Sequence, residues 1–313
     1  MRNVCMIGAG AIAAEHLAAL DACGEARLLA VADLDAQRAG AAAAKRGARV
    51  YTDYREMLRR EAPDAVIVNL PHALHEACVL ACAGAGADIL LEKPMSTGYA
   101  SCLRMIDACQ RAGVLLQVGH IQRYMPHNRA ARALIKSGAL GALAMVCDLR
   151  TNPYFTPERP RWFWRKETAG GGISMNYAAH SLDKLCYLTD SALAGVQGAC
   201  TYLAPGADVD GSAQMLVRME SGVSACVSLC GYRAPQVNET LLYFSDGVLR
   251  LRTGVSLEIS RGGAFEAVDA SAWPDAFAAQ WQDFLAAVRS RRVVHGTGDY
   301  AAAIVRAIEG LYR

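Results

Sequence analysis

The sequence predicts an α/β protein with two domains: an N-terminal doubly wound parallel (Rossmann) sheet, and a C-terminal α/β domain with a large, mostly antiparallel open sheet. Short, uniformly apolar segments alternate with helical segments over the first 120 residues, as in a parallel sheet covered on both faces. From about residue 142, the chain instead contains segments in which apolar and polar residues alternate. Turn signals such as Ser221-Gly222 and Asp246-Gly247 separate them. The length of 313 residues also favours two domains.

The expected elements of the first part follow one another as strand and helix. Strands are expected at residues 4–7, 28–32, 65–70, 88–91 and 114–118, and helices at 11–23, 36–46, 54–60, 72–83 and 99–112. Repeated right-handed crossovers place ligands at the carboxyl ends of parallel strands. The residues that bind a cofactor should therefore lie just after strands.

The second part begins with an alternating segment at 142–150, a long loop and one helix. Further strands are expected at 196–203, 212–219, 223–230, 239–244, 248–251 and 256–259, and closing helices at 275–289 and 300–312. We expect residues 1–120 to form the dinucleotide-binding domain. Residues 121–313 should form the substrate-binding and oligomerisation domain, with the closing helices packed back on the first domain.

Composition excludes several classes of protein. The chain is 53% apolar and 20% charged, enough to bury a core and unlike a disordered chain. A net charge of +2 without a basic, aromatic stripe gives no reason to expect a nucleic-acid partner. The longest apolar stretch, residues 77–91, is too short and too interrupted to span a bilayer. The first strand leaves no room for a signal peptide, so we expect a cytoplasmic protein.

The eleven cysteines are scattered, odd in number and without a C-x-x-C pair. Most lie in apolar segments, where cysteine behaves as a small hydrophobe. His75, Cys78 and Cys82 would share one helix face, but a structural zinc site usually has four ligands and no fourth is near. We expect these residues to be core and the chain to hold no metal.

Residues 2–14 predict a strand, a glycine turn and the start of a helix, with the pattern Gly8-x-Gly10-x-x-Ala13. Gly8 can adopt a turn conformation closed to other residues, and Gly10 lets a pyrophosphate approach the main chain. The helix N-terminus would present free N–H groups to the phosphates. By itself the pattern is weak, since any strand–turn–helix crossing can produce it.

Asp33 strengthens this interpretation, because it ends the next expected strand. A carboxylate at this distance from the glycine turn holds the ribose 2′-hydroxyl of NAD. It would also repel the 2′-phosphate of NADP, so NAD is the expected cofactor. The alternative is a solvated loop carboxylate beside Asp35.

Glu92-Lys93-Pro94 follows the expected strand at 88–91. Pro94 restricts Lys93 to an extended backbone, so the side chain is aimed and does not join a helix. A lysine at this end of a parallel strand would lie beside the cofactor. An exposed surface lysine is the alternative, and the tripeptide alone does not separate the two.

A second group of residues follows three glycines, Gly170 to Gly172. Asn176 and His180 are four residues apart and therefore share one face of the expected helix. A lone helical histidine is usually structural, but the glycine turn and the amide one turn earlier favour a catalytic role. The preceding loop, residues 152–166, is rich in aromatic and basic side chains, which suit a polyol substrate; packing or dimer contact is the alternative.

Taken together, the chain resembles the glucose-fructose oxidoreductase / inositol dehydrogenase (Gfo/Idh/MocA) family from residue 2 to about residue 190. The motifs that carry the resemblance are Gly8-x-Gly10-x-x-Ala13, Pro71 with His75, Glu92-Lys93-Pro94, Gly119-His120-x-x-Arg123-Tyr124 and Gly170-Gly171-Gly172…His180-x-x-Asp183. The resemblance implies a nicotinamide-dependent dehydrogenase or reductase of a sugar, cyclitol or related polyol. It also implies a homodimer or homotetramer formed through the C-terminal sheet.

In that family the residues matching Lys93 and His180 are catalytic, and an aspartate commonly stands where this chain has Asn176. An asparagine cannot ionise, although it can hydrogen-bond a substrate hydroxyl or orient Lys93. Cofactor contacts are expected at Gly8, Gly10, Ala11, Ile12, Asp33, Leu70, Pro71, His75, Glu92, Lys93 and His120. Substrate contacts are expected at Lys93, Arg123, Trp162, Asn176 and His180.

The expected reaction is reversible oxidation of a secondary alcohol, with His180 taking the hydroxyl proton and Lys93 stabilising the alkoxide. A non-catalytic dinucleotide sensor of the same fold is one alternative. Reduction of a non-sugar keto or imino metabolite, or a redox-neutral reaction with retained NAD, is another.

Overall fold

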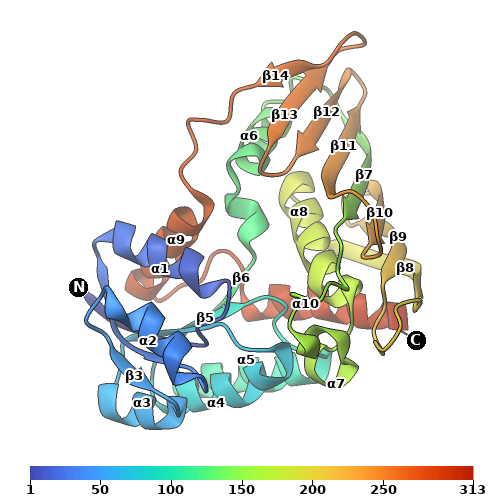
Figure 1. Ribbon diagram of the computed structural model, residues 1–313. Helices are drawn as coiled ribbons and strands as arrows, with labels where there is room; N and C mark the ends of the chain where they lie inside the picture. Colours follow the sequence, from blue (N-terminus) through green and yellow to red (C-terminus); the bar gives the residue numbers. More distant parts are fainter. Residues whose placement is uncertain (313) are drawn as a thin grey trace. The chain divides into compact units, whose positions relative to one another are not determined.

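The structure, a computed structural model, describes residues 1–312. These form two compact units, coloured along the chain in Figure 1. The first unit contains Met1–Gly119 and Phe277–Ala302, and the second contains His120–Ala276 and the chain from Ala303 onward. Helix α10 (Gly298–Glu309) contributes residues to both units.

The first unit contains a six-stranded parallel sheet in the order β3-β2-β1-β4-β5-β6. Its strands are β1 (Arg2–Ile7), β2 (Ala26–Ala32), β3 (Arg49–Tyr51), β4 (Ala65–Val68), β5 (Asp88–Glu92) and β6 (Leu116–Gly119). This confirms the predicted doubly wound sheet. Only β3 was missed, because it is three residues long and half exposed, without the apolar run that marks the others.

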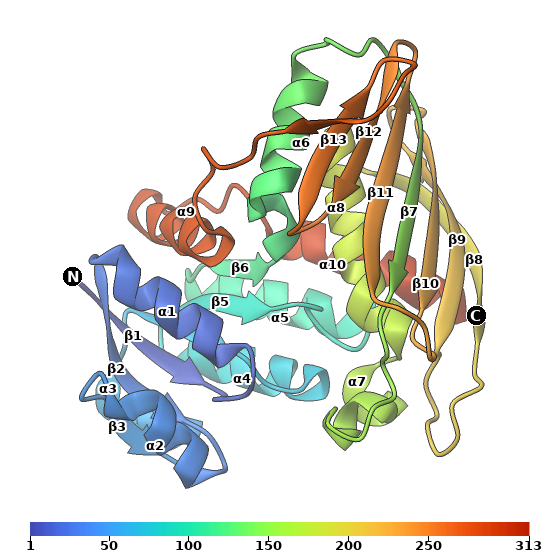
Figure 2. The ribbon, with the colours of Figure 1, turned by 45° about the horizontal axis from the view of Figure 1, so that its top comes forward.

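Helices cover both faces of this sheet (Figure 2). They are α1 (Ala13–Cys23), α2 (Ala36–Ala44), α3 (Tyr54–Glu61), α4 (His75–Gly84), α5 (Tyr99–Ala112) and α9 (Ala276–Ser290). Val4 and Met6 of β1 pack in one cluster with Leu17 of α1 and with Trp281 and Phe284 of α9. Most of the returning helix α9 therefore belongs to the core of the first unit.

The second unit contains an eight-stranded sheet in the order β14-β13-β12-β11-β7-β10-β9-β8. Its strands are β7 (Leu143–Thr151), β8 (Leu193–Thr201), β9 (Ser212–Met219), β10 (Ser224–Cys230), β11 (Val237–Phe244), β12 (Gly247–Arg252), β13 (Ser256–Ser260) and β14 (Glu266–Val268). All neighbouring strands are antiparallel except β7 and β10, as the mostly antiparallel prediction required. The short strand β14 was not predicted.

Helices α6 (Pro126–Lys136) and α8 (Ala179–Thr189) lie on one face of this sheet (Figure 2). Buried and exposed residues alternate along β9, as expected for a sheet with one covered face. The other face carries exposed apolar side chains, among them Met145, Leu149 and Leu216. The short elements are η1 (His72–Leu74), η2 (Ile121–Tyr124), η3 (Arg161–Trp164), α7 (Lys166–Ala169), the π-helical turn η4 (Ser174–Ala178) and η5 (Gly310–Tyr312).

Residues 1–312 contain neither a membrane-spanning helix nor a cluster of metal ligands. No helix there is long and apolar enough to cross a membrane. Within the same residues, no group of three or more histidine, cysteine, aspartate or glutamate side chains is arranged to hold a metal ion. All eleven cysteines are free thiols.

Candidate functional site

The glycine turn after β1 is held by the turn after β4. Gly8 has a φ of +92°, and a Cβ at this position would lie 2.5 Å from the carbonyl oxygen of Asn69. The Asn69 side chain donates a hydrogen bond to the Gly8 carbonyl at 3.4 Å. Only glycine fits here. Because β1 and β4 are the strands where the order of the sheet reverses, this turn lies at the topological switch point.

The same turn fits the pyrophosphate of a dinucleotide. A Cβ at Gly10 would meet no protein atom within 4 Å, so packing within the chain does not require a glycine there. The open main chain is what a close approach by a phosphate needs. Helix α1 begins just beyond, and no side chain among the described residues caps it at Ile12. Its N-terminal N–H groups and positive dipole end are suited to an anion.

Asp33 is tied to the glycine turn and is not a solvated loop residue. Its Oδ2 accepts a hydrogen bond from Ala9 N at 2.8 Å, and its side chain is only 10% exposed. Its Oδ1 accepts from the Arg38 guanidinium at 3.0 Å. Asp35 has a different role, because its side chain caps α2 by accepting from Gln37 N at 2.9 Å. Asp33 thus holds the glycine turn and Asp35 caps α2, while both carboxylates also pair with Arg38, that of Asp35 at 3.4 Å.

His75 is fully buried and bridges two loops. Its Nε2 lies 2.8 Å from the carbonyl oxygen of Leu70, and its Nδ1 lies 3.1 Å from that of Pro94 and 3.2 Å from that of Met95. Burial lowers the pKa of His75, against the opposing effect of these carbonyls. Both ring nitrogens face backbone, so His75 positions Leu70 and the Pro94 turn, and its expected cofactor contact stays a prediction.

Lys93 follows β5 directly, in a segment anchored by Glu92. The Glu92 carboxylate lies 3.0 Å from His16 Nε2 of α1 and accepts a hydrogen bond from Lys93 N at 3.1 Å. Burial by itself would raise the pKa of Glu92, but His16 and the charge of Lys93 together hold it below its usual value. An ionised carboxylate therefore joins the helix of the glycine turn to the lysine segment.

Parallel strands bring these residues to one edge of the first sheet. Gly8, Asp33 and Lys93 follow the carboxyl ends of β1, β2 and β5, and Pro71 lies three residues beyond the end of β4. His120 directly follows β6 and is buried. This arrangement of the predicted cofactor residues follows from the topology alone.

In the second unit, Asp210 holds the triple-glycine turn. Its carboxylate accepts hydrogen bonds from Gly172 N at 2.7 Å, Ser174 N at 2.8 Å and the Tyr312 hydroxyl at 2.9 Å. A Cβ on Gly171 would overlap Tyr312, and one on Gly172 would overlap the Asp210 backbone. The glycines are thus required by the close approach of the chain itself.

Asn176 lies in the π-helical turn η4 and His180 in the first turn of α8. Their exposed fractions are 6% and 9%, so both side chains are buried. The sequence predicted a continuous α-helix here, and the π-turn is a correction. A single π-turn inside a helix frequently marks a functional site.

Two buried ion pairs fix α8. Lys184 Nζ lies 2.6 Å from Asp148 of β7, and Asp183 pairs with Arg123 of η2. Burial would raise the pKa of Asp148, but Lys184 and the neighbouring hydroxyl donors lower it below its usual value. Arg123, which the resemblance placed in the substrate site, contacts Asp183 and so orients the helix that bears His180.

The loop at 152–166 is packed by its own side chains. Trp162 stacks on Phe163 with ring centres 3.7 Å apart, and Arg161 lies 4.1 Å from the ring centre of Trp164. The Arg159 guanidinium lies 4.1 Å from the ring centre of Tyr154. The packing alternative therefore describes much of this loop, while Arg159 also reaches Tyr177 near Asn176.

Sequence reasoning missed the residues that hold these segments together. They are His16, Asn69, Asp148, Arg150, Asn152, Tyr177, Lys184 and Asp210. Each acts through a contact between segments far apart in the chain, for which a single sequence carries no periodic or spacing signal.

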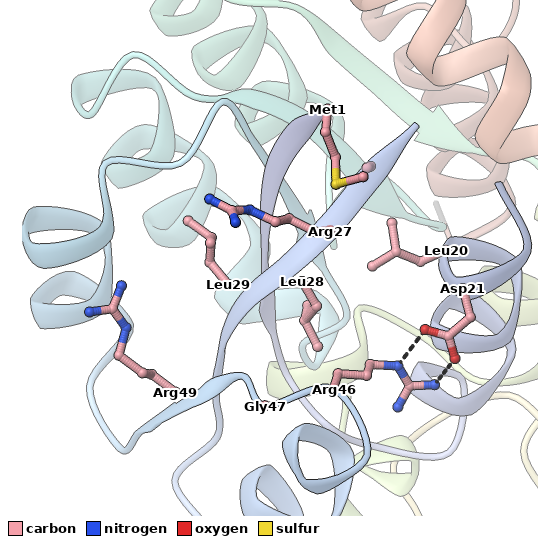
Figure 3. A pocket seen from close by; sticks show the side chains of 10 residues that line it. Met1, Leu20, Asp21, Arg27, Leu28, Leu29, Arg46, Gly47 and Arg49 are labelled. Carbon is pink, nitrogen blue, oxygen red and sulfur yellow. Dashed lines mark hydrogen bonds and ion pairs between the residues drawn. The ribbon is translucent and has the colours of Figure 1, made fainter. Parts of the chain in front are cut away.

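A cavity of about 740 Å³ in the first unit lies at the other end of the strands from Gly8, Asp33 and Lys93 (Figure 3). It is lined by Met1 and by the starts of β2 and β3, at the amino ends of the strands. Its arginines have partners: Arg46 pairs with Asp21 at 2.5 Å, Arg49 pairs with Glu61, and Arg27 donates to an asparagine. We assign no function to it.

Comparison with protein families gives two matches. Residues 2–120 match the model of an oxidoreductase family with an NAD-binding Rossmann fold. Residues 128–250 match the GFO/IDH/MocA C-terminal domain. The chain therefore has an NAD-binding Rossmann domain followed by the C-terminal domain of the same family.

Among curated proteins, inositol 2-dehydrogenase 2 of Saccharopolyspora erythraea is 37% identical over 161 residues, which cover 50% of this chain and 48% of the relative. An inositol 2-dehydrogenase of Corynebacterium glutamicum is 34% identical over 154 residues, covering 48% and 46%. The alignments thus span about half the length of these relatives.

Solved structures share the whole fold. An aldose-aldose oxidoreductase from Caulobacter crescentus, complexed with glycerol, has a TM-score of 0.91 at 23% identity, covering 100% of this chain and 96% of that one. A levoglucosan dehydrogenase in complex with NADH and levoglucosan has a TM-score of 0.90 at 19% identity, covering 99% of this chain and 96% of that one. With both domain models matched in order, the chain belongs to the GFO/IDH/MocA oxidoreductase family.

Proposed function

We propose that this protein is an NAD-dependent oxidoreductase that transfers a hydride between the cofactor and a secondary alcohol or ketone of a sugar, cyclitol or related polyol. The observation that supports it most is the sheet edge that brings the glycine turn, Asp33 and Lys93 together. The names of the relatives, inositol 2-dehydrogenase and levoglucosan dehydrogenase, support the substrate class.

In this proposal residues 1–120 hold the cofactor and residues 121–313 hold the substrate. Gly8, Gly10 and the start of α1 would hold the pyrophosphate, and Asp33 the adenosine ribose. When bound, the nicotinamide supplies the hydride acceptor or donor. His180 would take the proton of the substrate hydroxyl, because an imidazole titrates near neutral pH.

Lys93 would donate a hydrogen bond to the developing alkoxide, as a preorganised donor does where charge forms. Asn176 carries no charge and would hydrogen-bond a substrate hydroxyl without moving a proton. The Glu92 carboxylate would keep the Lys93 backbone in place, and Asp210 would do the same for the turn before Asn176.

We also propose that NAD is preferred over NADP, because the Asp33 carboxylate would repel a 2′-phosphate. Arg38 neutralises part of that charge at 3.0 Å, so the discrimination depends on both residues. The comparison of NAD and NADP as cofactors is the direct test.

A second copy of the chain is the proposed partner, through the uncovered face of the eight-stranded sheet. Met145, Leu149 and Leu216 give that face exposed apolar side chains of the kind that interfaces bury. Leu216→Glu should convert the assembly to monomers in sedimentation, whereas an unchanged mass would place the interface elsewhere.

A redox-neutral reaction with retained NAD is a second candidate. One relative, 31% identical over 163 residues, is named 2,7-anhydro-N-acetylneuraminate hydratase and comes from Mediterraneibacter gnavus. The test is a screen of sugars, sugar acids and inositols with NAD, followed by NADH absorbance and by product analysis. Net NADH supports the dehydrogenase; product without NADH, from protein that retains cofactor through purification, supports the second candidate.

A further inference from the structure

Two arginines of the second unit lie beside the turn that carries Asn176. Arg150, near the end of β7, has its guanidinium 4.4 Å from the ring centre of Tyr177. Arg159 donates a hydrogen bond to the Tyr177 hydroxyl at 3.1 Å and lies 4.1 Å from the ring centre of Tyr154. Both guanidinium groups therefore meet at one residue, directly next to Asn176 in the chain.

Tyr177 connects the two arginines to other donors. Its hydroxyl also accepts a hydrogen bond from Asn152 Nδ2 at 2.5 Å. An oxygen that accepts two hydrogen bonds has its own proton left to donate. Tyr154 packs edge-on against Tyr177 with ring centres 5.7 Å apart and is fully buried. We call Arg150, Asn152, Tyr154, Arg159 and Tyr177 the Tyr177 cluster.

The cluster carries positive charge without a carboxylate in contact. Within residues 1–312, neither Arg150 nor Arg159 forms an ion pair. Burial lowers the pKa of Arg150, against smaller opposing effects of Tyr177 and Asp148, so its surroundings disfavour the charge. A guanidinium nevertheless stays protonated at neutral pH. Arg150 and Arg159 are half-buried, and a partly desolvated cation without a carboxylate partner is stabilised when a counter-ion reaches it.

The carboxylates that act on the cluster have other partners. Asp148 accepts from Lys184 and from the Thr240 hydroxyl, each at 2.6 Å. Asp210 accepts from two backbone N–H groups and the Tyr312 hydroxyl. Beside the first-unit cavity, Arg46 pairs with the Asp21 carboxylate (Figure 3). Arg49 there pairs with Glu61, unlike Arg150 and Arg159.

We propose that the substrate is anionic, and that Arg150 and Arg159 bind its carboxylate or phosphate group. The proposal rests on the proposed function, because it names the substrate class of that site. Two guanidinium forks recognise either group by paired N–H donors. Tyr177 would add a neutral donor, and the uncharged amide of Asn176 would not repel the anion as an aspartate would.

Matched sugars test this directly. Glucose, glucuronate and glucose 6-phosphate differ at one carbon, as do galactose and galacturonate. We expect kcat/KM with NAD to be about tenfold or more higher for an acidic member than for its neutral partner, which is the worth of one charged hydrogen bond. Comparison of kcat/KM for the uronates with that for glucose 6-phosphate shows whether the site prefers a carboxylate or a phosphate.

Variants assign the effect to the arginines. Arg159→Gln should raise KM for the acidic sugar by about tenfold and change KM for the neutral sugar by less than about twofold. Arg150→Lys keeps the positive charge but removes the paired N–H donors of the guanidinium, so KM for the acidic sugar should rise by less than in Arg159→Gln. Arg233→Gln, which removes an exposed arginine of the same unit, is the control and should change neither. Thermal unfolding of each variant shows whether it folds.

The outcomes separate this inference from the proposed function. If neutral and acidic sugars are oxidised with the same kcat/KM, and Arg159→Gln changes KM for both alike, the anion site is wrong. The proposed dehydrogenase activity is then still supported. If calorimetry in the presence of NAD shows an acidic sugar bound through Arg159 but no NADH forms, the anion site remains and the dehydrogenase is wrong. Acidic sugars that neither bind nor react contradict the inference.

Discussion

His16 of α1 and Glu92 at the end of β5 are joined by a hydrogen bond of 3.0 Å, with the His16 side chain 1% exposed. The bond connects the helix that follows the glycine turn to the segment that bears Lys93. The His16 ring also packs edge-on against Phe277 of α9 at 5.0 Å. The two halves of the proposed cofactor site therefore share one buried contact.

Glu92→Gln tests this contact through pH. The pKa of Glu92 is lowered in the folded protein, so its ionisation stabilises the fold above the unfolded pKa of ~4.3, and this stability is lost as pH falls through the folded pKa. The variant should lower the free energy of unfolding at neutral pH by about 1–3 kcal/mol. It should also weaken the dependence of the free energy of unfolding on pH in the acid range. If urea titrations show the same pH dependence with and without the substitution, Glu92 is not ionised in the fold.

Asp33→Asn should move cofactor preference toward NADP. Removal of the negative charge leaves Arg38 free to meet a 2′-phosphate, and we expect the NADP/NAD ratio of kcat/KM to rise by about tenfold, or ~1.4 kcal/mol. Asp53→Asn is the matched control, because Asp53 caps a different helix, α3, which asparagine still caps, and the ratio should stay within about twofold. A ratio that does not move in Asp33→Asn would remove Asp33 from the ribose site.

Lys184→Met should destabilise the second unit. It would leave Asp148 buried and without its cation, which costs about 3–5 kcal/mol when one partner of a buried pair is removed. Arg111→Met breaks an exposed pair with Asp107 and should cost about 1 kcal/mol or less. Urea unfolding measures the loss of free energy of unfolding in each variant. Equal losses would show that burial of the Lys184–Asp148 pair does not matter for stability.

Most of the fold was predictable from the sequence because its signals are local. Helix α5 and strand β9 have the predicted bounds, since an amphipathic period and a turn mark their ends. Strand β3 and the π-turn η4 were not predictable. The first is too short for a pattern, and the second inserts one residue into a helix without changing its composition.

The site was predictable only where a residue follows a strand or a glycine turn. Gly8, Asp33 and Lys93 could be placed in this way. The contact of Arg123 with Asp183 could not, because it joins residues that are 60 positions apart, and the substrate contact expected of Arg123 stays a prediction. Asp210 escaped notice for the same reason: it contacts Gly172 from 38 positions away.

The most direct measurement is the turnover of Lys93→Ala, His180→Ala and the double variant, with NAD binding measured on each. Each single variant should lower kcat by roughly a hundredfold or more while the Kd of NAD stays within a few-fold. Because the two groups would act on one alcohol, the double variant should lose less than the product of the single losses. Unchanged turnover in both single variants would contradict the assigned roles, and loss of NAD binding in Lys93→Ala would make Lys93 a cofactor anchor.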